Sequence, residues 1–374
     1  MPPRIFIRTS GRAPLQFISH QVVTGDSLPV STPRTAPSFL SQHWFLLALA
    51  VILPTGVLGA DLLSGLNSHA WARTLIVCVV MGLMALPIPF ELIRRSLSRP
   101  WPALLASTIN MAGVPLLAWL AASTLPPYLG GGLIVAATIP CTLASAAVWT
   151  RRAGGDDTVA ILVTLITNLM CVVVTPLWLV ALLGRSVDLQ IAPLVQELVL
   201  VVLLPMAVTQ ALRLNRSVAQ WAERRKPTLA LTCQIGILTM VLLGAIQMGQ
   251  RMQLPPSATA AEALRGTDSV ALQAPSATFF EVVWTVLMAA AVHLVAMAIG
   301  WHIAARTGVA RAQQIGVAIS GSQKTLMIGL KLAMDCGVSI LPMVAYHVGQ
   351  LLLDTFIADR WRSATAEDRP SDFD

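Results

Sequence analysis

The sequence predicts an all-α integral membrane protein with about ten transmembrane helices, and three observations indicate this fold class. Hydrophobic residues make up 55% of the 374 residues and charged residues only 11%, whereas an ordinary soluble domain has roughly 25% charged residues. Apolar segments long enough to cross a hydrocarbon core of about 30 Å as helices recur between charged loops. Because each segment is continuously apolar, we expect a helical bundle rather than a membrane β-barrel.

The chain begins with a polar tail, residues 1–42, which is rich in Pro, Ser, Thr and Arg and lacks the apolar core of a secretory signal. We predict that this tail is disordered. The alternatives are that it is a targeting segment, or that the translation start has been assigned too far upstream. Two halves of five spans each follow, 43–183 and 193–358, joined by a linker at 184–192 and followed by a second tail, 359–374. The predicted spans are His43–Ala60, Thr74–Phe90, Pro102–Ser123, Pro127–Thr150, Thr158–Leu183, Pro193–Leu212, Leu229–Met248, Val282–His302, Ala310–Leu332 and Ile340–Ile357.

The distribution of Lys and Arg predicts the orientation of these spans. Basic residues gather in both tails and in alternate loops, and the other side receives only Arg73, Arg185, Arg251 and Arg265. The positive-inside rule then places both termini in the cytoplasm, in a multi-pass protein of the cell (inner) membrane. The net charge of +7 is therefore a topology signal, and we expect lipid rather than nucleic acid as the partner.

Two spans are interrupted by polar residues near their middles. The fourth contains Pro140, Thr142 and Ser145, and the ninth contains Gly321 within the run 320–325. We predict helix breaks at Pro140 and Gly321, because proline removes a backbone hydrogen bond and glycine lets the chain unwind. Paired breaks at corresponding positions of two halves are typical of secondary transporters. The fourth break taken alone also fits a purely structural kink.

Lys324 lies inside the ninth span and is the most costly residue of the sequence. A lysine near the bilayer centre costs roughly 2.5–3.5 kcal/mol on insertion scales, so an intramembrane charge is a functional-site hypothesis. The structural alternative is that Lys324 extends to the interface, or pairs with a carboxylate or backbone carbonyls as a tie. Lys331, nearer the end of the span, is expected to extend to the interface.

Several motifs, in this order and spacing, resemble one family. They are Met81-Gly82-Leu83, Ala153-Gly154-Gly155-Asp156, Val174-Thr175-Pro176-Leu177, Gly321-Ser322-Gln323-Lys324-Thr325-Leu326 and Tyr346-His347-Val348-Gly349-Gln350-Leu351. The chain resembles the bile acid:sodium symporter superfamily, in its SBF-like branch, from Trp44 to Arg360. The resemblance implies two inverted five-helix repeats, a panel domain of spans one, two, six and seven, and a core domain in which interrupted helices 4 and 9 cross. It also implies secondary active transport of a small organic anion by alternating access.

The resemblance implies a sodium site, but this chain departs from the pattern. Ile319 and Lys324 stand where relatives have glutamate and asparagine at the ninth-helix break, while Thr164 and Gln323 keep oxygen atoms and define the remaining sodium hypothesis. Because an ammonium repels a cation, the sharper hypothesis is that Lys324 replaces the bound ion, permanently or by taking up a proton in each cycle. It predicts sodium-independent, pH-sensitive uptake that is lost in Lys324→Ala. Sodium or a proton is thus the expected coupling ion, with no other cofactor.

His347 and Gln350 match the family's Tyr-His-x-x-Gln pattern and lie one turn apart on one helix face. This pattern is equally compatible with two roles for these side chains: facing the transport path, or packing inside the protein. The predicted substrate- and ion-binding residues are Asn110, Thr142, Ser145, Thr164, Ser320, Gly321, Ser322, Gln323, Lys324, His347 and Gln350.

The sequence also raises two other classes of function. An intramembrane serine hydrolase needs a paired nucleophile and base, but Ser322 and Lys324 are two residues apart and diverge on a helix, so we expect no enzyme. A membrane protein with a transporter fold that regulates ion or glycan homeostasis without carrying a substrate remains an alternative. The sequence does not specify the substrate or the oligomeric state.

Overall fold

A computed structural model describes residues 39–67, 69–89, 100–184, 189–253 and 277–367. Residues 1–43 form a unit separate from 44–374, and the description below concerns the second unit. Its helices are α1 (Phe39–Leu58, from Trp44 on), α2 (Ala70–Ala85), α4 (Trp101–Thr108), α5 (Val114–Ala122), α6 (Pro127–Thr138), α7 (Ser145–Arg152), α8 (Asp157–Leu183), α9 (Ile191–Leu198), α10 (Leu204–Leu212), α11 (Arg216–Arg224), α12 (Lys226–Gln253), α14 (Phe279–Arg306), α15 (Arg311–Ser322), α16 (Leu326–Asp335) and α17 (Leu341–Glu367).

The prediction of an all-helical membrane protein is confirmed, since the described ranges contain no β-strand. Within these ranges, six helices are long and apolar enough to cross a membrane. They are Trp101–Ala122, Asp157–Leu183, Ile191–Leu212, Lys226–Met252, Phe279–Arg306 and Leu341–Ser363. The full ten-span topology stays a prediction.

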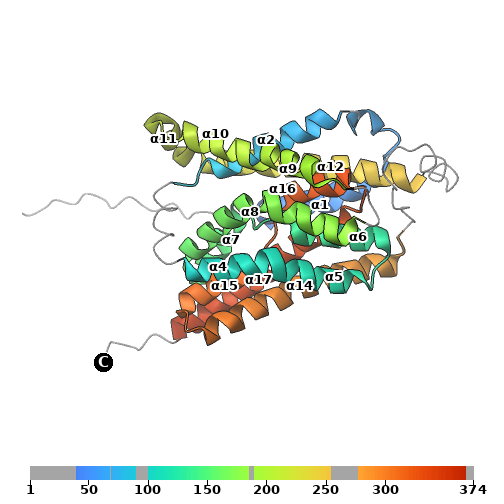
Figure 1. The fold of residues 1–374 in the computed structure, drawn as a ribbon. Coiled ribbons are helices and arrows are strands. Elements are labelled where there is room, and N and C mark those ends of the chain that lie inside the picture. Colours follow the sequence, from blue (N-terminus) through green and yellow to red (C-terminus); the bar gives the residue numbers. More distant parts are fainter. Residues whose placement is uncertain (1–38, 68, 90–99, 185–188, 254–276, 368–374) are drawn as a thin grey trace, which may run out of the picture. The chain divides into compact units, whose positions relative to one another are not determined.

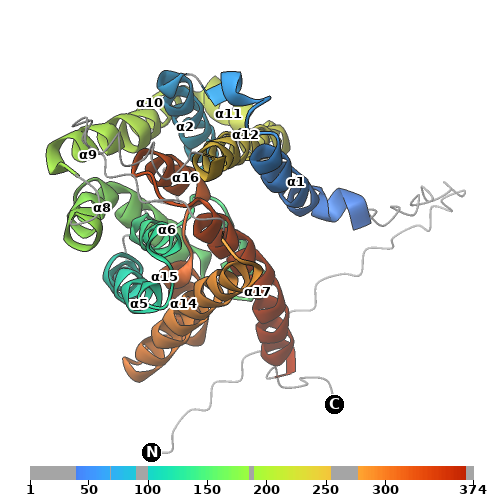
Figure 2. The ribbon, with the colours of Figure 1, turned by 90° about the vertical axis from the view of Figure 1, so that its right-hand side faces the viewer.

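The helices of residues 44–374 are arranged in two layers. In the small layer, α2 packs against α10 and α12, and α1 and α9 complete it (Figure 2). In the large layer, α15 packs against α4, α7, α8 and α14, and α17 packs against α6 and α14. α16 lies between the layers and contacts α2 and α12 on one side and α6 and α17 on the other.

Two of the long helices contain a π-helical turn, and each turn has a proline at its end. η2 (Ile109–Gly113) joins α4 to α5 just before Pro115, and η3 (Val199–Leu203) joins α9 to α10 just before Pro205. Proline lacks an N–H and clashes with the carbonyl four residues earlier, and a wider turn removes that clash. η2 also turns the buried Asn110 toward the centre of the large layer.

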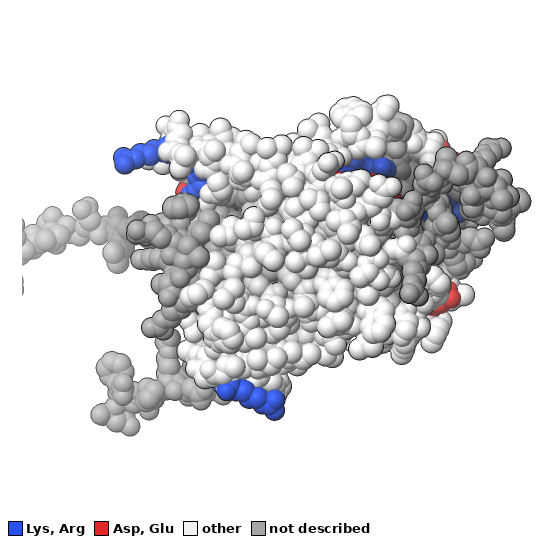
Figure 3. Space-filling view, in the orientation of Figure 1, with Lys and Arg blue, Asp and Glu red and all other residues white. Residues whose placement is uncertain are grey.

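The surface between the two ends of the molecule is apolar. Large side chains that are well exposed include Leu116 on α5, Val173 on α8 and Leu287 on α14. On the face shown in Figure 3, charged side chains are confined to the two ends. An uncharged belt of this kind is what lipid-facing helices require.

The predicted limits of the tails differ from the structure at both ends. Residues 39–42 belong to α1, and α17 continues to Glu367, beyond the predicted start of the second tail at residue 359. The remainder of the two predicted tails, and residues 185–188 of the predicted linker, lie outside the described residues. Polar residues of the last turns, such as Arg360, extend a helix as readily as apolar ones, so the apolar pattern marks the membrane segment but not the helix end.

Candidate functional site

Two interrupted helices meet at the centre of the large layer. The first interruption, Ile139–Ala144, separates α6 from α7, and the second, Gln323–Thr325, separates α15 from α16. The backbone N–H of Thr325 donates to the carbonyl of Pro140 at 3.0 Å, so the two interruptions contact each other directly. Pro140 lies within the first interruption. Gly321 lies in the last turn of α15, two residues before the second interruption begins, and has helical geometry.

Lys324 is fully enclosed between the interruptions, with only 1% of its surface exposed. Its Nζ donates to Asn110 O at 2.6 Å, to Asn110 Oδ1 at 3.0 Å and to Ile139 O at 2.9 Å. Three acceptors match the three N–H bonds of an ammonium group. Lys324 therefore does not extend to the interface, and its hydrogen-bond partners in the described part of the chain are uncharged oxygens.

Asn110 connects η2 to the end of α15. Its Nδ2 lies 2.8 Å from Gln323 O, 3.2 Å from Ser320 O and 3.4 Å from Gly321 O. These are carbonyls at a helix C-terminus that have no intrahelical partner. The carbonyls that a broken helix could offer to a cation are thus already hydrogen-bonded to an amide.

Gln323 is the central side chain of a second set of contacts. Its Oε1 accepts from Ser145 Oγ at 3.0 Å and from Thr142 Oγ1 at 3.4 Å, and its Nε2 donates to Asp354 Oδ2. Asp354 Oδ1 also lies 3.0 Å from His293 Nε2. Both Asp354 and His293 are completely buried.

Asp354 is not among the predicted site residues, because a carboxylate three residues before the end of the predicted last span, Ile340–Ile357, has no distinctive local pattern. A usable signal was present, since His347, Gln350 and Asp354 recur at three- and four-residue spacing on one face of α17. The sequence gives no signal for the partner of His293, because Asp354 lies 61 residues away in the chain.

Gln350 holds the second interruption open. Its Oε1 accepts from the backbone N–H of Lys324 at 2.8 Å, and its Nε2 donates to the carbonyl of Lys324 at 2.9 Å and to His347 Nδ1 at 2.9 Å. One side chain therefore replaces the helical partners that Lys324 has lost. This gives the physical reason why the helix ends after Ser322 rather than at Gly321.

Hydroxyl and amide groups of α8 support the first interruption. Thr164 donates to Thr142 O at 2.9 Å, Asn168 to Cys141 O at 3.2 Å, and Thr175 to Thr138 O at 2.6 Å. Of these three, only Thr164 was a predicted site residue. Its hydroxyl donates to the carbonyl of Thr142, whereas Gln323 accepts from the hydroxyl of Thr142.

Ser320 and Ser322 were also predicted to bind substrate or ion. Their hydroxyls donate to carbonyls of their own helix, at Gly316 (2.5 Å) and Ala318 (3.0 Å) respectively. The carbonyl of Ser322 accepts from Tyr346 Oη at 2.8 Å. The structure therefore places both serines in the supporting wall of the site.

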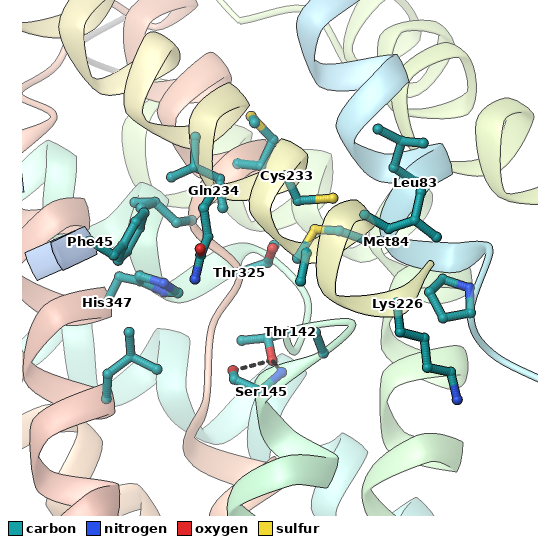
Figure 4. Close-up of a pocket in the computed structure, with 18 residues that line it drawn as sticks. Phe45, Leu83, Met84, Thr142, Ser145, Lys226, Cys233, Gln234, Thr325 and His347 are labelled. Atoms are coloured by element: carbon teal, nitrogen blue, oxygen red, sulfur yellow. Dashed lines mark hydrogen bonds between the residues drawn. The ribbon is translucent and has the colours of Figure 1, made fainter. Parts of the chain in front are cut away.

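A cavity of about 240 Å³ lies between the two layers, at the end where α2 finishes and α12 begins. Gln234 of α12 and His347 of α17 reach into it from opposite layers, and Thr142, Ser145 and Thr325 form its inner end (Figure 4). The remaining wall is apolar except for Lys226 of α12, whose ammonium is paired with Glu223. The cavity therefore brings Thr142, Ser145 and His347 of the predicted site together, whereas Lys324 lies just behind its wall.

Polar contacts join the layers at the opposite end, where α2 begins and α16 finishes. Lys331 of α16 donates to Glu197 of α9 and, at 2.7 Å, to Asp335. Asp335 also lies 3.6 Å from Arg73 of α2. From α12, Gln247 donates to Met334 O (3.0 Å) and Arg251 to Gly337 O (2.6 Å). The expectation that Lys331 extends to the interface is wrong, because two carboxylates hold its ammonium in a buried position.

The model of the SBF-like CPA transporter family matches residues 38–249 and 268–363. "Probable sodium/metabolite cotransporter BASS4, chloroplastic" of Oryza sativa subsp. indica is 28% identical over 244 residues, 62% of this chain and 54% of the rice protein. "Sodium/bile acid cotransporter 7" of Danio rerio is 23% identical over 212 residues, 54% of this chain and 61% of the fish protein. The chain thus spans between half and two thirds of these relatives.

Proposed function

Because the chain belongs to the SBF-like CPA transporter family and is a multi-pass membrane transporter, we propose that it carries a small organic anion by alternating access. The single observation that carries this proposal is the contact between two interrupted helices beside a cavity that separates two layers. Discontinuous helices of this kind form the binding sites of secondary transporters. Relatives named as cotransporters support it.

The proposed topology has ten spans in two inverted repeats. Both termini lie on the cytoplasmic side of the cell (inner) membrane. The small layer is then the panel domain, and the large layer with α16 is the core domain. The cavity lies on the side that carries most Lys and Arg, which is the cytoplasmic side. The protein would therefore face inward, with the contacts of Lys331, Glu197, Asp335 and Arg73 closing the outer side.

We propose that Lys324 acts as a permanent, tethered cation in place of a transported one. The three acceptors at 2.6–3.0 Å use all three N–H bonds of the ammonium, which supports a permanent charge over a proton taken up in each cycle. The charge is buried beside the cavity, and its hydrogen bonds within the described residues are to neutral oxygens, which favours an anion nearby. A sodium ion at Thr164 and Gln323 is the competing proposal for the coupling ion.

The test is uptake of organic anions into proteoliposomes in sodium and in choline medium of equal ionic strength. We expect equal uptake in both media and loss of uptake in Lys324→Ala. Undiminished sodium-driven uptake by this variant would overturn the proposal.

A second readout needs no substrate. Lys324→Ala vacates Asn110 O, Asn110 Oδ1 and Ile139 O, and oxygen ligands of this kind can hold a hard cation. Sodium, compared with choline, should therefore raise the unfolding temperature of Lys324→Ala and leave the wild type unchanged. An equal effect of sodium on both proteins would place its site elsewhere and contradict the tethered-cation role.

A further inference from the structure

The cavity between the layers limits the size of its ligand. Its volume is about 240 Å³. An apolar cavity of about 150 Å³ accepts benzene, with six heavy atoms, so in proportion this one accepts about ten. A four-ring steroid acid is far larger than that.

Most of the cavity wall is apolar. Leu83 and Met84 contribute from α2, Leu229 and Ile237 from α12, and Met327 from the first turn of α16. Contact with such a wall strengthens binding by about 0.8 kcal/mol for each buried methylene group. The body of the ligand is therefore a hydrocarbon chain or a small ring.

The inner end of the cavity favours an anion. Thr325, the residue before α16, makes no capping hydrogen bond with its side chain, and Thr325, Leu326 and Met327 all line the cavity. The first N–H groups of a helix have no intrahelical partner and carry the positive end of its dipole. The ammonium of Lys324 donates to Ile139 O at 2.9 Å, next to the Pro140 carbonyl that accepts from Thr325 N–H.

His347 supplies a neutral donor at the same end. Its Nδ1 accepts from the amide nitrogen of Gln350 at 2.9 Å, and an amide nitrogen can only donate. The ring proton is therefore on Nε2, and the ring extends into the cavity (Figure 4). An acceptor on the ligand, such as one carboxylate oxygen, matches this donor.

We propose, building on the organic-anion function above, that the substrate is a monocarboxylate of about ten heavy atoms. Its carboxylate binds at the first turn of α16 beside His347, and its apolar body lies between α2 and α12. The proposal assigns both a size limit and an orientation to the transported molecule.

A native cysteine provides the test. Cys233 lines the cavity and Cys78 does not, so bound ligand should slow N-ethylmaleimide labelling of Cys233 alone, as located by mass spectrometry in the full-length protein. The probes are straight-chain carboxylates from butanoate to dodecanoate, octanamide and cholate. The concentration giving half protection should fall about fourfold per methylene up to octanoate and then stop falling. The concentration of octanamide that gives half protection should be about tenfold higher than that of octanoate, because the amide lacks the charge-assisted hydrogen bonds of a carboxylate.

A matched pair of variants locates the effect. Ala230 lines the cavity, whereas Leu231 does not and is 47% exposed. Ala230→Phe should move the optimum to a shorter acid, and Leu231→Phe should leave it at octanoate. Cholate protecting better than octanoate would overturn the size limit, and equal protection by octanamide would overturn the carboxylate assignment. Absence of protection by every acid would overturn the site itself, whereas the transport proposal fails separately, if no organic anion enters proteoliposomes.

Discussion

Replacing Asn110 by leucine should destabilise the protein more than the same change at any comparable amide. Asn110 is completely buried. Its Nδ2 serves the carbonyls of Gln323 and Ser320, at 2.8 and 3.2 Å, and its Oδ1 accepts from Lys324 Nζ at 3.0 Å. Leucine has nearly the same shape and removes all of these bonds.

The magnitude follows from the groups that lose their partners. A buried acceptor left without a hydrogen bond costs about 1–3 kcal/mol, and a hydrogen bond to a charged group contributes about 1.5–3 kcal/mol. Two carbonyls and one ammonium bond at the low end of these ranges give a loss of about 4 kcal/mol in the free energy of unfolding.

Asn168 provides a matched control within the same layer. Its Nδ2 also serves two carbonyls, Cys141 O at 3.2 Å and Thr164 O at 2.8 Å, but its buried Oδ1 has no hydrogen-bond partner in the described structure. Asn168→Leu therefore removes an unsatisfied oxygen along with two donors. Its expected loss is about 1 kcal/mol, from the same costs per group.

Reversible unfolding of the purified protein in mixed micelles, followed by the fluorescence of its 10 tryptophans, measures both losses. The contact between Asn110 and Lys324 predicts that Asn110→Leu is the more destabilising change by about 3 kcal/mol. Losses that agree within about 1 kcal/mol would refute the idea that the ammonium depends on Asn110.

Two further predictions concern packing and the closed end. A Cβ on Gly132 of α6 would lie 2.2 Å from the backbone oxygen of Ser339, so Gly132→Ala should lower the unfolding temperature sharply. Gly349→Ala, with open space around it, should not. Equal effects would contradict the close contact of α6 with the segment that precedes α17. Glu197→Gln removes the carboxylate that links α9 to Lys331, and a loss of about 1 kcal/mol should lower the ratio of inward-facing to outward-facing protein about fivefold and slow maleimide labelling of Cys233. Asp157→Asn, which breaks the ion pair with Arg151 inside the large layer, is its control, and equal labelling in both variants would show that Glu197 does not hold the layers together.

The helical segments were predictable because the bilayer imposes a simple rule on sequence. Every spanning residue must satisfy its backbone within the helix and present an apolar side chain to lipid. That rule placed α8 and α14 to within a few residues of their observed limits. It does not apply where the chain leaves the membrane, and α17 accordingly continues to Glu367, well beyond the predicted limit at Ile357.

The candidate site was predictable where its residues break that rule. Pro140 and Lys324 are costly in a lipid-spanning helix, and the structure brings their segments into contact. Asp354 was missed because a single carboxylate near the end of an apolar run has the same local pattern whether it faces water or a buried glutamine. Its role depends on Gln323 and His293, which lie 31 and 61 residues away in the chain.

By itself, the sequence determined that this protein is a helical membrane protein, that two of its helices are interrupted, and that a charge lies within one of them. These properties follow from local composition and from the cost of polar groups in lipid. Only the tertiary structure decided how that charge is held, because its partners Asn110 and Ile139 are 214 and 185 residues distant. Hydrogen bonds between distant segments satisfy buried polar groups, and no local pattern in the chain records which segments will meet.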